Sequence, residues 1–118
     1  MHQRPYEKLI VWQEAYKLCL FVYRVTSEFP SYEKFGLANQ ARRSAVSVPL
    51  NIAEGNAKHS KPDQARFLDI AIGSLEELHC SLRISRDLEY MDNGQFERID
   101  HSVQRTSFLL MRLRKTCK

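Results

Sequence analysis

Several features are missing from this sequence of 118 residues, and each absence excludes a class of protein. No apolar run approaches the roughly 20 residues that a membrane-spanning helix needs. The opening MHQRPYEK lacks the apolar core of a signal peptide. No strand-like alternation, repeat or low-complexity segment is present. We therefore expect a cytoplasmic, helical protein with no membrane partner.

The common enzyme motifs are also missing. The sequence contains no phosphate loop, no HExxH, no Cys-His-Asp arrangement and no paired metal carboxylates on facing helices. We therefore expect neither enzymatic activity nor a cofactor.

Cysteine is scarce, and its placement argues against both disulfides and a metal site. Cys19, Cys80 and Cys117 are odd in number and far apart, which suits small apolar fillers in a reducing compartment. A metal site at His79 and Cys80 would need distant partners, because adjacent helical residues point about 100° apart. No metal site is expected.

Helical patterns account for almost the whole sequence. Four helices are predicted, over about residues 6–29, 33–56 and 60–90, and from the residues after 92–94 to the tail. Short connections between them imply antiparallel neighbours. The predicted fold is all-α: an antiparallel up-down four-helix bundle, with residues 1–118 forming a single domain.

Glycine and proline set the expected helix boundaries. Pro30 closes the first helix, and Gly55 is a stop signal for the second. Gly36 could delay the start of the second helix, and Pro49 inside it should produce a kink near residues 45–49. Ser60 is the expected cap of the third helix.

The second helix carries a polar line between two apolar lines. The line recurs at steps of three and four and comprises Gln40, Ser44, Ser47, Asn51, Glu54 and Lys58. A helix that is apolar on two sides is packed on two sides, so we expect this polar seam to be buried and paired. A structural polar core is the first interpretation, and a catalytic or ligand site is the alternative.

An antiparallel hairpin of the second and third helices brings two polar lines together. It places Ser47 near Ser74 and Glu54 near Arg66. It also places Arg43 opposite Glu77, our preferred buried ion pair, for which Glu77→Ala should cost roughly 3–5 kcal/mol. An acid–base pair for catalysis is the alternative, but no nucleophile lies beside it. The predicted seam comprises Arg43, Ser47, Asn51, Glu54, Ser74 and Glu77.

The fourth helix carries a basic stripe beside its core line. Arg98, Arg105 and Arg112 recur at steps of seven, with Lys115 just off the stripe. Arginines spaced about 10 Å apart could follow a phosphate backbone, and Phe108 could stack on an unpaired base. The alternative is a solvated face, or a face between subunits whose arginines meet acids such as Glu76, Asp87 or Glu89.

The tail is basic, and its cations fit two interpretations. Residues 101–118 hold five Lys or Arg and no Asp or Glu. Arg114, Lys115 and Lys118 could contact phosphate, or they could stabilise the carboxyl end of their own helix through its dipole.

The first helix has more apolar circumference than one bundle core needs. One side carries an aromatic line, and apolar residues occur elsewhere on the helix as well. The line comprises Trp12, Tyr16, Cys19, Val22, Tyr23 and Thr26. Such an excess usually signals an interface with another protein chain.

Several motifs in order resemble one family. They are LIVWQEAYKL, the FP at Phe29–Pro30, FGLANQARRSAVS, NIAEG and FLDIAIGSLEEL with Gly73, Ser74 and Glu77. Over nearly the whole chain the sequence resembles the four-helix-bundle family of 23S rRNA intervening-sequence proteins, which is similar to the accessory variability protein of diversity-generating retroelements. The resemblance implies a small up-down bundle that assembles as a ring, often a homopentamer. Nucleic-acid binding and partnership with a reverse transcriptase are themes of its retroelement branch.

Two functions are therefore expected. The first is a non-enzymatic homo-oligomer that binds nucleic acid, structured RNA before DNA, through its arginine stripes. The second is a scaffold that docks a larger protein, such as a reverse transcriptase, through the same basic face. The salt dependence of nucleic-acid binding separates the two.

Overall fold

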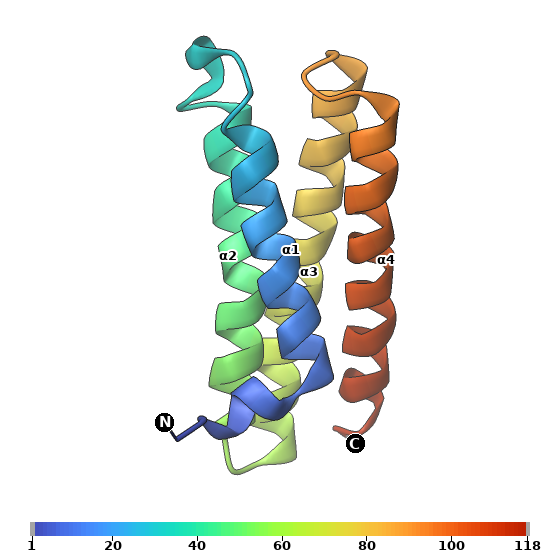
Figure 1. Cartoon of the computed structure of the whole chain (residues 1–118). Coiled ribbons are helices and arrows are strands. Elements are labelled where there is room, and N and C mark those ends of the chain that lie inside the picture. The colour runs from blue at the N-terminus through green and yellow to red at the C-terminus, as the bar shows by residue number, and fades with distance from the viewer. Residues whose placement is uncertain (1, 118) are drawn as a thin grey trace.

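The computed structural model describes residues 2–117, and within them the fold is all-α with four long helices and no strand (Figure 1). The helices are α1 (Ile10–Thr26), α2 (Leu37–Asn56), α3 (Lys61–Asp87) and α4 (Asn93–Lys115). Two short 3₁₀ turns, η1 (Pro5–Lys8) and η2 (Ser31–Glu33), precede α1 and α2. The predicted all-α fold and number of helices are confirmed. Lys118 lies outside the described residues.

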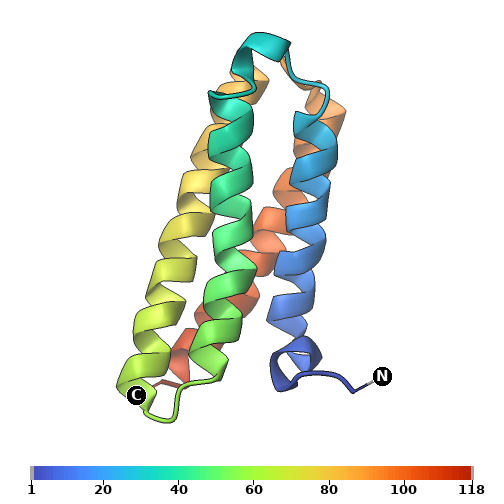
Figure 2. The ribbon, with the colours of Figure 1, turned by 90° about the vertical axis from the view of Figure 1, so that its left-hand side faces the viewer.

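Successive helices run in opposite directions and pack side by side (Figures 1 and 2). α2 packs most extensively on α3, and α1 lies against both α2 and α4. Both ends of the chain and the α2–α3 turn lie at one end of the bundle, while the other two connections lie at the opposite end. We call the first the basic end and the second the loop end.

Two helices begin later than predicted, and each is preceded by a short 3₁₀ turn. α1 begins at Ile10 because Leu9 is extended (φ −74°, ψ 126°) and separates it from η1. α2 begins after Gly36, as its glycine suggested, and the Glu33 carboxylate accepts a hydrogen bond from the Leu37 amide at 3.1 Å. Ser60 caps α3 as predicted, since its hydroxyl accepts from the Asp63 amide at 3.2 Å.

α2 is helical from Leu37 to Asn56, so it ends one residue after Gly55, where the sequence predicted. Gly55 thus lies in the last turn of α2. It is buried, and a Cβ atom there would lie 3.1 Å from the Cβ of Phe67, so glycine lets the ends of α2 and α3 approach closely. The helix continues through the buried Pro49, and the predicted kink stays a prediction.

One apolar core runs between the four helices. Its fully buried large side chains come from every helix: Leu18, Ile52, Leu75, Leu78, Leu82, Ile99 and Leu110. On α1 the core face comprises Val11, Ala15, Leu18, Val22 and Val25. The aromatic line of α1 is divided: Val22 and Thr26 are buried, Trp12 and Cys19 pack against the core, and Tyr16 and Tyr23 are exposed.

Candidate nucleic-acid interface

The predicted polar seam exists, but only its centre is paired. The Ser47 and Ser74 hydroxyls lie 2.7 Å apart across α2 and α3, as the hairpin register predicted. The Asn51 amide donates to the Ser47 carbonyl oxygen at 2.8 Å and to the Ser47 hydroxyl at 3.0 Å. These three side chains are half-buried and satisfy one another, which favours the structural interpretation of the seam.

The outer part of the predicted seam is wrong. Arg43 and Glu77 are both exposed, and no ion pair joins them among residues 2–117. Glu54 and Arg66 are exposed as well, and the Arg66 guanidinium lies 4.8 Å from the centre of the Phe67 ring. At these positions the polar residues of α2 and α3 face solvent rather than each other, so their charges are not buried.

A polar contact between α1 and α2 was not predicted. Arg42 donates from Nε to the Thr26 hydroxyl at 2.8 Å, and its guanidinium lies 4.8 Å from the centre of the Tyr23 ring. Thr26 is buried and also donates to the Val22 carbonyl oxygen at 2.7 Å. The same reasoning from a short connection, applied to the hairpin of α1 and α2, could have predicted this contact.

The basic stripe of α4 is on the surface, as predicted, but its members are not equivalent. Arg98, Arg105, Arg112 and Lys115 are all exposed, and Phe108 is 60% exposed. Arg105 forms an ion pair with Glu14 of α1, with 3.1 Å between Nε and a carboxylate oxygen, so its charge is already paired. The alternative of a face between subunits, with Glu76, Asp87 or Glu89 as partners of the arginines, stays a prediction.

The two ends of the stripe differ in their surroundings. The Arg98 side chain lies along α4, beside Gly94 one turn earlier. Its Nη1 atom is 3.4 Å from the place that a Cβ atom at Gly94 would occupy. Arg112 lies over the Phe108 ring at 5.6 Å, one turn from Lys115. The carboxyl-terminal half of α4 therefore joins an exposed ring to two cations that have no ion pair within residues 2–117.

Arg114 differs from its neighbours in the tail. Its guanidinium donates to both carboxylate oxygens of Asp69 on α3, at 2.8 and 3.4 Å, and this hydrogen bonding raises the pKa of Arg114. Arg114 thus ties α4 to α3. Of the two tail cations that the structure describes, Arg114 and Lys115, Arg114 has a defined structural role.

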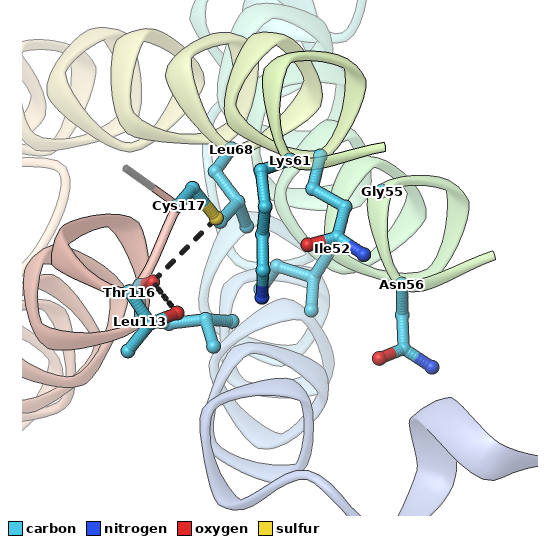
Figure 3. A pocket seen from close by; sticks show the side chains of 9 residues that line it. Ile52, Gly55, Asn56, Lys61, Leu68, Leu113, Thr116 and Cys117 are labelled. Atoms are coloured by element: carbon cyan, nitrogen blue, oxygen red, sulfur yellow. Dashed lines mark hydrogen bonds between the residues drawn. The ribbon is translucent and has the colours of Figure 1, made fainter. Parts of the chain in front are cut away.

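A small cavity of about 210 Å³ lies at the basic end, between α2, α3 and the carboxyl end of α4 (Figure 3). Ile52, Leu68 and Leu113 line it with apolar atoms, and the Lys61 side chain extends into it. Its volume is below the roughly 300 Å³ of typical small-molecule sites.

Three further observations limit the chemistry of the chain. Within residues 2–117, no three His, Cys, Asp or Glu side chains are placed to share a metal ion. No helix among these residues is both long and apolar enough to cross a membrane. The three cysteines are free thiols, and partial burial raises the pKa of Cys19.

The chain is similar to known proteins in sequence pattern and in fold. The profile of the 23S rRNA-intervening sequence protein family matches residues 7–112. A crystal structure from Bacteroides thetaiotaomicron VPI-5482, a protein of unknown function from the S23 ribosomal protein family, is similar with a TM-score of 0.84 and 22% sequence identity. That similarity covers 90% of this chain and 99% of the other, and at this identity it shows the shared fold alone. No curated protein matches the sequence. With a profile match over nearly its whole length, the chain belongs to the family of 23S rRNA-intervening sequence proteins.

Proposed function

We propose that this chain is a non-enzymatic, homo-oligomeric bundle protein, with a pentameric ring as the first candidate assembly, that binds nucleic acid through basic helical surfaces. Structured RNA is the first candidate ligand and DNA the second. The observation that carries the proposal is the exposed group of Phe108, Arg112 and Lys115 on α4. Membership of a family that is named for an rRNA intervening sequence agrees with this choice of ligand.

The chemistry of this group suits an RNA loop. Arg112 and Lys115 lie about one turn apart and supply two cations for neighbouring phosphates. The exposed ring of Phe108 offers a face on which an unpaired base can stack, an interaction worth about 1–3 kcal/mol. Such contacts fix affinity more than sequence preference, so binding should be electrostatic and weakly specific.

Exposed apolar side chains support self-association. On α1 and α2 they include Tyr16 and Tyr23 at 46% and 42% exposure and Leu50 at 62%. Such residues on neighbouring helices are a surface that a second copy of the chain could cover. An oligomer would repeat the α4 group in each subunit, so that weak contacts add up to useful avidity.

The test compares RNA binding by the parent and by an Arg112→Gln/Lys115→Gln variant at several salt concentrations. Log affinity decreases as log salt increases. If both cations contact phosphate, this decrease should become shallower in the variant, by about two units of slope. The matched control is Arg98→Gln with Arg105→Gln, because Arg105 is bound by Glu14 and Arg98 lies at the other end of α4. Equal binding by a folded Arg112→Gln/Lys115→Gln variant would remove this group as the contact.

A second candidate function is a scaffold that docks a larger protein, such as a reverse transcriptase. The exposed apolar side chains of α1 and α2, Tyr16, Tyr23 and Leu50, favour it, because a protein partner could cover them and a phosphate backbone could not. In this case the basic group of α4 would meet an acidic protein surface. The parent would then bind RNA only weakly at physiological salt, and it would co-purify with its partner.

A further inference from the structure

The positive charge of the chain is concentrated at one end of the bundle. The segments at the basic end, residues 2–12, 52–70 and 108–117, hold eight Lys or Arg and four Asp or Glu. The segments at the loop end, residues 24–37 and 83–98, hold five Lys or Arg and six Asp or Glu. The surplus of cations therefore lies at one end, and the loop end is close to neutral.

Several elements contribute to this surplus, so it extends beyond the stripe of α4. η1, the α2–α3 turn and the carboxyl end of α4 meet at this end in both views of the bundle (Figures 1 and 2). None of the cations that we assign to it makes an ion pair within residues 2–117. They are Arg4, Lys8, Lys58, Lys61, Arg112 and Lys115.

Helix stability accounts for some of these cations, because Arg112 and Lys115 lie in the last turn of α4, but it does not account for Lys61. Lysine or arginine stabilises the carboxyl end of a helix and is unfavourable in the first turn, where the helix dipole is positive. Lys61 is the first residue of α3. At that position a cation costs a few tenths of a kcal/mol rather than contributing stability.

Structural features keep two of the cations at this end. The Lys58 ammonium lies 5.1 Å from the centre of the Phe67 ring, and the Lys58 carbonyl oxygen accepts a hydrogen bond from the Gln64 side chain at 2.9 Å. The Lys61 side chain extends over the apolar lining of the cavity (Figure 3). Lys58 in the α2–α3 turn and Lys61 at the start of α3 are thus both held at this end.

We infer that the basic end of the bundle is the surface that contacts the sugar-phosphate backbone, with Lys58 and Lys61 as direct phosphate contacts beside Arg112 and Lys115. The inference rests on the proposed function and names the part of the molecule that performs it. These cations come from more than one element at the same end of the bundle, whereas the stripe comes from α4 alone. The lysines donate to phosphate as point charges, so the surface recognises the backbone rather than the bases.

The test is RNA binding by a Lys58→Gln/Lys61→Gln variant of the full chain, measured by fluorescence anisotropy with a labelled RNA hairpin at several salt concentrations. We expect the decrease of log affinity with log salt to be shallower in this variant than in the parent, by about two units of slope. The matched control is Arg24→Gln/Lys34→Gln, which removes two exposed, unpaired cations from the loop end and should leave the slope unchanged. Circular dichroism and the melting temperature establish that each variant is folded.

The outcomes separate this inference from the proposed function. If the parent binds and the folded Lys58→Gln/Lys61→Gln variant binds equally well, the inference is wrong and the proposed function stands. If the control loses as much affinity as this variant, net charge alone drives binding and the inference is also wrong. If the parent does not bind RNA or DNA, both fail. Should the lysine variant not fold, Arg4→Gln/Lys8→Gln tests the same surface with the same expected loss of slope.

Discussion

At the scale of single residues, polar side chains pair across helices only where their position around the helix faces the core. Ser47 and Ser74 meet at 2.7 Å because both lie at the edge of the core. Arg43 and Glu77 share nearly the same height on the hairpin but point outward into solvent. A charged pair that water already solvates contributes little to stability.

This contrast gives a test on adjacent residues. Glu77→Ala should change the free energy of unfolding by no more than about 0.5 kcal/mol, since Glu77 is exposed. Leu78→Ala should cost about 2–5 kcal/mol, because Leu78 is fully buried. Urea unfolding of the two variants and the parent measures both values. A loss of several kcal/mol for Glu77→Ala would restore the buried ion pair that the structure rejects.

The same residues show how far a sequence can predict this structure. Register follows from short connections, so the contact of Ser47 with Ser74 could be predicted. The rotation of each helix depends on what the other helices cover, so sequence spacing alone could not decide between burial and exposure for Arg43. The pairing of Arg105 with Glu14 joins the first and last helices, which no local pattern places in register.

Between elements, a polar cluster connects the two loops at the loop end. The Tyr90 hydroxyl, just after α3, donates to the Glu33 carboxylate of η2 at 2.8 Å and lies 3.5 Å from the Tyr32 hydroxyl. Glu33 also accepts from the amide of Leu37 at the start of α2. One carboxylate thus holds the start of one helix and the end of another.

This cluster predicts a pH dependence. Hydrogen bonds to Tyr32 and Glu33 and the nearby negative charge raise the pKa of Tyr90. The bond to Glu33 needs the protonated phenol, so its contribution is complete below the ordinary tyrosine pKa of about 10 and is lost as pH rises through the higher folded-state pKa. Tyr90→Phe should therefore lower the melting temperature at neutral pH, and the difference from the parent should shrink under strongly alkaline conditions.

The control for that comparison is Tyr6→Phe, which corrects for the ionisation of other tyrosines. Thermal unfolding by circular dichroism from about pH 7 to about pH 11 covers the beginning of this loss, which starts near the ordinary tyrosine pKa of about 10. Equal melting temperatures at neutral pH, or a difference that does not shrink at high pH, would show that the contact is not formed in solution.

At the scale of the whole molecule, the bundle presents an apolar surface on α1 and α2 and a basic surface at one end. Tyr16, Tyr23 and Leu50 remain exposed while the core is already filled by all four helices. Such a distribution is typical of a protein whose final apolar burial takes place between chains.

Assembly is therefore the first property to measure in solution. Light scattering at micromolar concentration should give a multiple of the 13.8 kDa chain mass, with five copies as the first candidate. Leu50→Lys should reduce that mass by placing a charge in the contact, whereas Leu88→Lys, at an exposed position after α3, should leave it unchanged. A strictly monomeric parent would contradict the proposed oligomer.

The most direct test of the account is equilibrium binding of the parent protein to a structured RNA over a range of salt. We predict binding whose log affinity falls linearly with log salt between about 50 and about 200 mM, with a slope that reports several phosphate contacts. We propose that the basic end supplies these contacts, so the slope should be that of a surface with several cations rather than of one or two lysines. Absence of binding at the lowest salt, or an affinity that does not change with salt, would contradict the claim that this bundle binds nucleic acid.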